Sequence, residues 1–290
     1  MSLDARAADP AAAEMRESCA CPLCGADRPV HAGYAMDGYE AVRCGACGAW
    51  YLSPRLAEAA MAAAYARDDY FEGGDSGYAA YAAQEKSLRG TFRRLLGEMR
   101  GRGIAGGSLL DVGCGYGYLL DEARPFFAQR AGTDFSPAAA ERARSFGAEV
   151  WTGGVDAVPP GRVFDCVTAL HVVEHVYHPH PFVAQLAERI RPGGWLVLAA
   201  PDAGSFWRRL MGRRWPSWKF PEHVMFYDRT TLERLVRALP RAAEIVPLPY
   251  PHAFPLSEVA AKLRLRAPKA IAGRNLWLPA TTVCVAARLR

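Results

Sequence analysis

The sequence predicts an α/β fold with a doubly wound, mostly parallel sheet, preceded by a small cysteine-rich unit. Strand-like and helix-like segments alternate from Ser108 to Arg290, an order typical of sheets with helices on both faces. Two C-x2-C pairs lie before Trp50 and suit a metal-stabilised ribbon. At 290 residues, the chain has room for an α/β domain of ~180 residues with ~100 residues in front.

Apolar runs of strand length supply the elements of the sheet. Ser136 and Pro137 follow the second run and read as a helix N-cap and an N1 proline. This order of strand, cap and helix supports parallel strands joined by helical crossovers. The expected strands cover 109–111, 129–134, 149–152, 164–170, 195–200, 243–248 and 281–289.

Two later helices are marked by their ends. One is expected to stop at the Pro-Gly-Gly sequence of residues 192–194. Another is expected to begin at Thr230, which forms a capping box with Glu233. The first of these helices places four apolar side chains on one face: Phe182, Val183, Leu186 and Ile190.

Composition and motif spacing also predict the division of the chain. Residues 1–18 are rich in alanine and charge with little to bury, and we expect a flexible tail there. A zinc ribbon is expected over 19–55, and a helical connecting or cap segment over 56–105. The main domain covers 106–290, and within it residues 204–227 interrupt the alternation and are interpreted as a lid insertion.

The two C-x2-C pairs predict a structural zinc site. A glycine follows each pair and relaxes the backbone, so that N–H groups can turn toward the thiolates. Four thiolates leave zinc no open position for chemistry, which favours a structural role. The alternatives are a redox pair or plain reduced thiols, and Cys19 is a spare neighbour of Cys21. The predicted ligands are Cys21, Cys24, Cys44 and Cys47.

The first strand of the domain ends in an acid and three alternating glycines. Asp111 is followed by Gly113, Gly115 and Gly117, which let the backbone bend and approach a ligand closely. A dinucleotide turn needs its third glycine where Tyr118 stands, and a carboxylate here would repel a pyrophosphate. No Gly-Lys-Ser or Gly-Lys-Thr follows, which excludes a P-loop. The turn therefore favours a cationic ligand.

This strand, acid and GxGxG sequence resembles motif I of the class I S-adenosylmethionine (SAM) methyltransferases. The strand ending at Asp134, the segment His-Val-Val-Glu-His-Val at 171–176 and the Arg-Pro-Gly-Gly strand at 191–201 resemble that family too. The resemblance implies a Rossmann-like sheet of seven strands with the seventh antiparallel. The ribbon, residues 50–55 and the Asp-Asp-Tyr-Phe sequence at 68–71 resemble bacterial methyltransferases of polysaccharide or specialised small-molecule pathways.

The resemblance also implies contacts with the cofactor SAM. Asp111 would face the methionyl amine, the glycine turn would pack against the methionine moiety, and Asp134 would accept the ribose hydroxyls. Val155 and Asp156 stand where the family contacts adenine, although the usual Gly-Asp-hydrophobic order is changed here. The implied cofactor residues are Asp111, Gly113, Cys114, Gly115, Gly117, Asp134, Phe135, Val155, Asp156 and Leu170.

Histidines supply the candidates for a catalytic base. SAM is an activated donor, so a base helps only where the acceptor carries a proton. His175 is the first candidate, because imidazole titrates near neutrality and this residue follows the fourth strand. His171 and His223 are the others, and the alternative for each is a packed or solvent-facing histidine.

A catalytic metal is a further alternative. Some ubiquinone-pathway O-methyltransferases that resemble this fold hold a divalent metal with a Glu-Glu-His cluster. Glu174 and His175 match two of its members, but His171 precedes Val172 and Val173 where a second acid is needed. We therefore expect Glu174 to be a structural acceptor near a helix N-terminus.

The insertion at 204–227 is rich in tryptophan and arginine. In class I methyltransferases segments at this place cover the acceptor, so the resemblance implies that Trp215, Trp218 and His223 form a pocket wall. The alternative is a solvated lid with an aromatic core. Four arginines favour an anionic group on the acceptor, such as a phosphate or carboxylate: Arg208, Arg209, Arg213 and Arg214.

Together these features predict a SAM-dependent methyltransferase, with O-methylation of a small-molecule or saccharide-like acceptor as the preferred reaction. RNA methylation is the alternative, because arginine and tryptophan side chains of the insertion could stack on bases. The net charge of +5, concentrated in the insertion and in 262–269, is however mild for a nucleic-acid binder. A second alternative is a scaffold protein that binds SAM without catalysing a reaction. The sequence contains no transmembrane-length apolar run and no signal-peptide core, so we expect a cytoplasmic protein.

Overall fold

The computed structural model describes residues 15–65, 81–82, 84–256 and 274–290. Most of the predicted flexible tail, the sequence at 68–71 and the basic stretch at 262–269 lie outside the described residues. Among the described residues, no helix combines the length and the apolar character needed to cross a bilayer.

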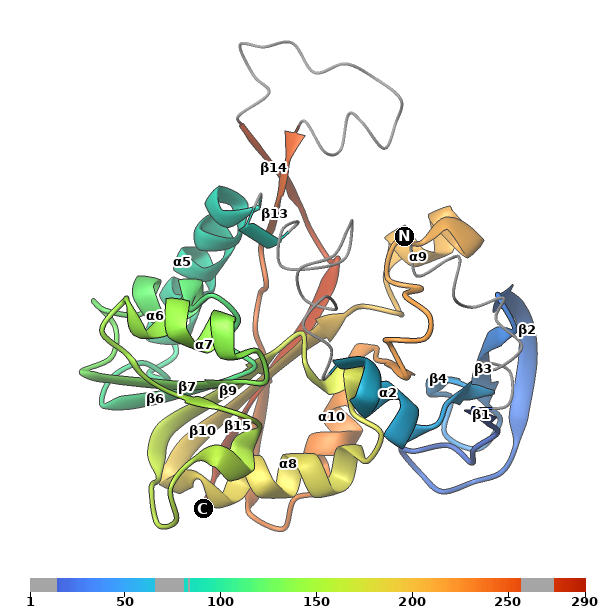
Figure 1. Ribbon diagram of the computed structural model, residues 1–290, viewed down its shortest axis with the longest axis horizontal. Coiled ribbons are helices and arrows are strands. Elements are labelled where there is room, and N and C mark those ends of the chain that lie inside the picture. The colour runs from blue at the N-terminus through green and yellow to red at the C-terminus, as the bar shows by residue number, and fades with distance from the viewer. Residues whose placement is uncertain (1–14, 66–80, 83, 257–273) are drawn as a thin grey trace.

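The described chain contains a seven-stranded sheet at the centre of the main domain (Figure 1). The strand β15 is antiparallel to both of its neighbours, and the other neighbouring strands are parallel. The predicted doubly wound sheet and its one antiparallel strand are confirmed. In sheet order the strands are β12 (Ala242–Pro247), β15 (Thr282–Leu289), β10 (Ile190–Pro201), β9 (Phe164–Leu170), β6 (Ser108–Val112), β7 (Gln129–Asp134) and β8 (Glu149–Thr152).

The order of the strands determines where a ligand can bind. From β6 the chain first adds β7 and β8 on one side, and then returns to add β9 and β10 on the other. The connections after β6 and β9 therefore diverge from each other at the carboxyl edge of the sheet. Such a switch point is where open α/β sheets bind their ligands.

Helices cover both faces of the sheet (Figure 1). Buried side chains alternate between the faces, so that Leu109 belongs to one apolar cluster and Leu110 to the other. The predicted cap is confirmed, because the Ser136 hydroxyl accepts the Ala139 N–H at 3.2 Å. One face carries α5 (Glu85–Gly101), α6 (Tyr118–Glu122) and α7 (Pro137–Arg144), and the other carries α8 (Pro179–Glu188) and α10 (Arg229–Arg237).

Two predicted helix ends are wrong. The helix α10 is capped by Asp228, whose carboxylate accepts the Thr231 N–H at 2.8 Å, and not by Thr230. An aspartate cap also suits the positive end of the helix dipole, which explains the earlier start. The helix α8 ends at Glu188, and Ile190 already belongs to β10, so the helix stops before the Pro-Gly-Gly sequence.

The N-terminal ribbon is joined to the main domain by strand pairing. In the described chain, a four-stranded sheet has the order β11 (Met225–Phe226), β4 (Trp50–Leu52), β3 (Tyr39–Cys44) and β2 (Pro29–Met36). The strand β11 belongs to the insertion, so the insertion contributes an edge strand to the sheet of the ribbon. Short elements before the main domain are β1 (Arg16–Glu17), β5 (Arg55–Leu56) and α2 (Glu58–Tyr65).

The tryptophans of the insertion pack against the ribbon. Trp218 stacks on Tyr34 with ring centroids 5.0 Å apart and lies 6.1 Å from the ring of Trp50. Trp215 and Trp218 are only 5% and 7% exposed. The structure therefore places both in a core shared by ribbon and domain, rather than in the wall of an open acceptor pocket. The short helices α9 (Phe206–Met211) and η5 (Gly212–Arg214) precede them.

A hairpin between β12 and β15 was not predicted from the sequence. It consists of β13 (His252–Pro255) and β14 (Asn275–Leu278) and packs on α5. The Ser87 hydroxyl donates to the Asn275 side-chain oxygen at 2.7 Å, and the Ala253 N–H donates to the Thr91 hydroxyl at 2.9 Å. The hairpin brings residues 250–252 to the carboxyl edge of the sheet, close to His171.

Candidate active site

The glycine turn after β6 is shaped by close backbone packing. A Cβ atom on Gly113 would lie 2.5 Å from a methyl carbon of Val172, and one on Gly117 would lie 2.7 Å from the Cβ of Ala143. Both glycines also have positive φ angles, 76° and 77°. The Thr133 carbonyl accepts the N–H groups of Gly113 and the following Cys114, which ties the turn to β7. Glycine is therefore the residue type that fits at these two positions, and without Cβ atoms the backbone can approach a ligand closely.

Two buried carboxylates flank this turn. Asp111 is 4% exposed and accepts the Thr168 hydroxyl at 2.6 Å. Burial raises the pKa of Asp111 to about 7, and the nearby Asp134 adds to the rise, while the Thr168 hydrogen bond opposes it. Asp134 accepts the Gly115 N–H at 2.7 Å through one oxygen and the Ser136 N–H at 3.0 Å through the other. A cationic ligand group would stabilise this pair of carboxylates, in agreement with the cationic ligand predicted from the sequence.

An exposed aromatic ring follows the second carboxylate. Phe135 is 72% exposed, which is unusual for a phenylalanine in an ordered turn. A Cβ atom on Gly154 would lie 3.2 Å from the Phe135 ring and 2.9 Å from an Asp156 oxygen. Val155, by contrast, is 5% exposed and belongs to the core. Phe135 and Asp156 therefore both border Gly154, and this combination suits a flat ring with an amino group.

Tyr81 covers the glycine turn from the segment before α5. A Cβ atom on Gly115 would lie 3.3 Å from its hydroxyl, and its ring stacks on Tyr118 with centroids 5.4 Å apart. Burial raises the pKa of Tyr81 well above its ordinary value. Sequence reasoning did not assign Tyr81 to the site. The sequence feature that could have identified it is the tyrosine-rich segment that ends at this residue.

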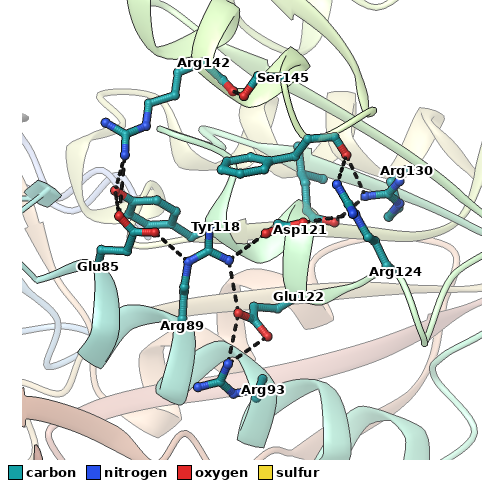
Figure 2. Close-up of polar contacts among 12 residues, drawn as sticks. Glu85, Arg89, Arg93, Tyr118, Asp121, Glu122, Arg124, Arg130, Arg142 and Ser145 are labelled. Carbon is teal, nitrogen blue, oxygen red and sulfur yellow. Dashed lines mark hydrogen bonds and ion pairs between the residues drawn. The ribbon is translucent and has the colours of Figure 1, made fainter.

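An ion-pair network holds the helices beside this turn (Figure 2). Arg89 of α5 contacts Asp121 and Glu122 at the C-terminal end of α6, at 2.7 Å and 3.1 Å. Glu85 accepts the Tyr118 hydroxyl at 3.3 Å and pairs with Arg142 of α7 at 3.5 Å. The network connects α5, α6 and α7 around the glycine turn.

His171 follows β9 directly and faces a buried carboxylate. Its φ angle is 58°, a conformation that is rare outside glycine and is often found at functional sites. Its Nδ1 lies 3.4 Å from Oε1 of Glu174, whose side chain is 2% exposed. Within the described part of the chain, Nε2 of His171 and Oε2 of Glu174 are buried without a hydrogen-bond partner. Such atoms are costly to bury and indicate a site for a ligand.

The other two candidate histidines lie against the same carboxylate. His175 belongs to η4 (Val173–His175), and its ring meets that of His223 edge-to-face at 4.7 Å. Burial lowers the pKa of His223 well below its ordinary value, and the neighbouring His175 adds to this effect. One nitrogen of each ring and a carboxylate oxygen of Glu174 all lie within 4.8 Å of one another. The structure therefore brings the three predicted candidates, including His171, together around Glu174.

Two further residues of this cluster were missed by sequence reasoning. The ring of Tyr250 lies 5.5 Å from that of His171, and the ring of His252 lies 5.9 Å from it. Burial lowers the pKa of His252 to about 3, and the charge of His171 adds to the decrease. No local motif marks these residues, because the hairpin that begins at His252 is recognised only from its packing.

The four predicted cysteine ligands form one cluster in the ribbon. The sulfur atoms of Cys21 and Cys47 lie 3.6 Å apart, as do those of Cys24 and Cys44. Tetrahedral zinc with sulfur ligands at about 2.3 Å separates them by ~3.8 Å, so the cluster has the size of a zinc site. Cys19 instead donates its S–H to the Leu52 carbonyl at 3.6 Å.

Comparison with known proteins identifies the domain. A family model described as a methyltransferase domain matches residues 81–239, more than half of the chain. The mitochondrial ubiquinone biosynthesis O-methyltransferase of Schizosaccharomyces pombe is 34% identical over 105 residues, which are 33% of this chain and 38% of that protein. The ubiquinone biosynthesis O-methyltransferase of Bordetella bronchiseptica is 30% identical over 158 residues, 50% of this chain and 64% of that protein.

Solved structures agree on the fold. A SAM-dependent methyltransferase from Thermotoga maritima, described as a possible histamine N-methyltransferase, matches with a TM-score of 0.53 and 16% identity, over 73% of this chain and 94% of that chain. A SAM-dependent methyltransferase from Archaeoglobus fulgidus matches with a TM-score of 0.52 and 16% identity, over 72% of this chain and 99% of that chain. The chain spans about two fifths of the length of the first curated relatives that it matches.

Proposed function

The chain belongs to the methyltransferase family whose model it matches, and we propose that it transfers the methyl group of SAM to an oxygen atom of a small-molecule acceptor. The observation that carries this proposal is the pair of buried carboxylates, Asp111 and Asp134, around the glycine turn at the switch point of the sheet. The curated relatives named O-methyltransferases support oxygen as the acceptor atom.

Each part of SAM has a counterpart in the site. Asp111 is suited to the methionyl ammonium, which would favour its ionised form. Asp134 would accept the ribose hydroxyls through its carboxylate oxygens, each of which accepts one backbone N–H and can accept more than one hydrogen bond. Phe135 and Asp156 would hold adenine between them. Leu170, at the end of β9, would lie beside the sulfonium.

His171 is best placed to act as the base. SAM supplies a methyl group that is already activated on a sulfonium, so alignment of the reactants provides much of the acceleration. As the carbon–oxygen bond forms and the carbon–sulfur bond breaks, the acceptor proton passes to Nε2 of His171. Glu174, 3.4 Å from Nδ1, stabilises the imidazolium that results. This assignment replaces His175, which packs against His223.

The ribbon supplies a second part of the proposal, a structural zinc ion held by Cys21, Cys24, Cys44 and Cys47. The size of the cluster supports it. Cobalt bound to four thiolates gives an intense sulfur-to-metal absorption, which is expected for the cobalt-substituted chain and lost in Cys24→Ser. Absence of this absorption in the wild type would contradict the zinc assignment.

Two arginines of the insertion contact the protein itself, which weakens the argument for an anionic acceptor. Arg208 lies 5.3 Å from the centre of the Trp50 ring and donates to the Ala203 carbonyl, and Arg213 donates to the Ala35 carbonyl. The buried Trp215 and Trp218 are also unavailable for stacking on RNA bases. These contacts favour a small-molecule acceptor over RNA.

Calorimetry with SAM and with its demethylated product tests the proposal. We expect both to bind, and Asp134→Ala to weaken binding by ~2–3 kcal/mol, because hydrogen bonds to a charged group are lost. A wild-type chain that binds neither molecule would refute a SAM-dependent reaction. A screen of hydroxylated acceptors with labelled SAM then identifies the acceptor.

A further inference from the structure

The segment that carries Glu174 is connected to the ribbon through the insertion. The Val224 N–H donates to the Glu174 carbonyl at 2.9 Å, and the Leu52 N–H of β4 donates to the Val224 carbonyl at 3.0 Å. Val224 is fully buried and directly follows His223. A single residue of the insertion therefore joins the sheet of the ribbon to η4.

A second connection runs from the cysteine cluster itself. Leu23 lies between Cys21 and Cys24, and its carbonyl accepts a hydrogen bond from Nε2 of His180 at 2.8 Å. His180 belongs to the first turn of α8, the helix that follows η4. The turn around Leu23 is closed by the Gly25 N–H, which donates to the Cys21 carbonyl at 2.8 Å. The backbone of one cysteine pair thus holds the start of α8.

A third contact lies between these two. The Tyr177 hydroxyl donates to the Leu56 carbonyl at 2.7 Å, and the Arg55 guanidinium lies 4.4 Å from the centre of the Tyr177 ring. Both partners belong to β5, where the ribbon ends. Residues 174–180 are therefore held at both ends and in the middle by the ribbon and the strand that ends it.

The cofactor side is anchored in another way. The glycine turn is bonded to β7 through the Thr133 carbonyl and the Asp134 carboxylate, and Asp111 is bonded to Thr168 of β9. These partners belong to the central sheet. The ribbon is thus connected to the acceptor side, whereas these hydrogen bonds of the cofactor side stay within the main domain.

We propose that the ribbon positions the acceptor side of the site, and that His180 is a positioning residue for it. Thiolates bound to a metal fix the turn around Leu23, and a unit of fewer than about 40 residues usually needs such a metal to fold. The ribbon then sets the backbone of Glu174, whose carboxylate lies 3.4 Å from Nδ1 of His171. This role in the reaction rests on the proposed function, whereas the coupling of the ribbon to η4 and α8 does not.

Hydrogen exchange of the full-length chain, with zinc bound and after treatment with a chelator, tests the coupling without measuring activity. Amide exchange in 172–176 and 220–227 should become about tenfold faster or more without the metal, because hydrogen bonds to the ribbon open with it. Exchange in 111–117 and the dissociation constant of SAM should be unchanged. Unchanged exchange in 220–227 would overturn the proposal. Equal acceleration in 111–117 would also overturn it, because the chain would then unfold as a whole.

His180→Ala is a milder test that keeps all four cysteines. Loss of its hydrogen bond to Leu23 should speed exchange in 172–176 by about three- to tenfold. His180→Gln should restore the protection, because its side-chain amide can donate in place of Nε2. With an acceptor from the screen, His180→Ala should lower kcat/KM for that acceptor by the same factor and leave KM for SAM unchanged. A loss that His180→Gln does not reverse would overturn the positioning role.

His178→Ala is the matched control, because this exposed histidine lies two positions earlier and pairs with Glu58 of α2. Exposed ion pairs contribute little to stability, so exchange and kinetics should match those of the wild type. An effect as large as that of His180→Ala would contradict a specific role for the Leu23 contact. A wild-type chain that binds no SAM would instead refute the proposed function. The exchange test does not depend on SAM, so the two failures are distinguishable.

Discussion

The cofactor side and the acceptor side of the site are built in different ways. The cofactor side comes from the carboxyl ends of β6 and β7 and from the turns after β6, β7 and β8, at 111–117, 134–135 and 154–156. The acceptor side combines 171–175 with residues of the insertion and with 250–252 at the start of the hairpin. One side is therefore local in sequence, whereas the other exists only after the insertion and the hairpin have packed.

The physical constraints differ accordingly. On the cofactor side, backbone geometry determines the shape of the site. Gly113 and Gly117 have positive φ angles and neighbours within 3 Å of the position that a Cβ atom would take. On the acceptor side, buried polar side chains determine the chemistry of the site. His171 and Glu174 each have a buried atom that lacks a hydrogen-bond partner among the described residues. Substitutions on the first side should affect binding and stability, and substitutions on the second should affect turnover.

The largest expected effect is on the acceptor side. His171→Gln removes the proposed base, so we expect kcat to fall by about 100- to 10,000-fold. Because the residue does not belong to the glycine turn, the dissociation constant of SAM should be unchanged. Steady-state kinetics and calorimetry measure the two quantities, and His31→Gln, an exposed histidine of the ribbon, is the control. Undiminished turnover would return the role of base to His175.

The second effect is on the cofactor side. Gly117→Ala places a methyl group 2.7 Å from the Cβ of Ala143 at a positive φ angle, and we expect the free energy of unfolding to fall by ~2–4 kcal/mol. Gly97→Ala is the matched control. Gly97 lies inside α5 with no atom near the added Cβ, so alanine should stabilise the chain by up to ~1 kcal/mol. Chemical denaturation compares the two, and equal stabilities would show that the turn tolerates a side chain.

The same division explains what could be predicted from the sequence. The seven strands, the cap at Ser136 and the glycine turn were predicted correctly, because apolar runs, caps and glycine spacing are local signals. His252 was missed because the hairpin that carries it has no such signal. The Asp228 cap was missed because Thr230 and Glu233 matched a capping pattern two residues later, while Glu233 in fact pairs with Arg229.

The insertion shows the limit of reasoning from composition. Its tryptophans and arginines predicted an acceptor-facing lid, but Trp218 packs between Tyr34 and Phe226. The position of the insertion is determined by the pairing of β11 with β4, which joins residues about 175 positions apart in the chain. Of the insertion's predicted site residues, His223 reaches the histidine cluster.

The third expected effect is a pH dependence of cofactor binding. Because burial raises the pKa of Asp111 to about 7, the free protein holds a proton there at lower pH. The SAM ammonium favours the ionised form, so binding must expel this proton below pH 7. Affinity should then fall by up to ~10-fold per pH unit between pH 7 and pH 5. Asp111→Asn should bind more weakly at pH 7 and show a flatter profile; an equally steep profile would assign the proton to another group.

The smallest expected effect concerns the exposed ring beside Gly154. If Phe135 stacks on adenine, Phe135→Ala should weaken SAM binding by about 1 kcal/mol, roughly fivefold. Phe206→Ala is the matched control, since Phe206 is similarly exposed, at 66% against 72%, but belongs to α9 of the insertion. Calorimetry on both variants separates a ring that binds adenine from one that is merely exposed. Equal affinities would remove Phe135 from the cofactor side and leave adenine to Asp156 and the backbone around it.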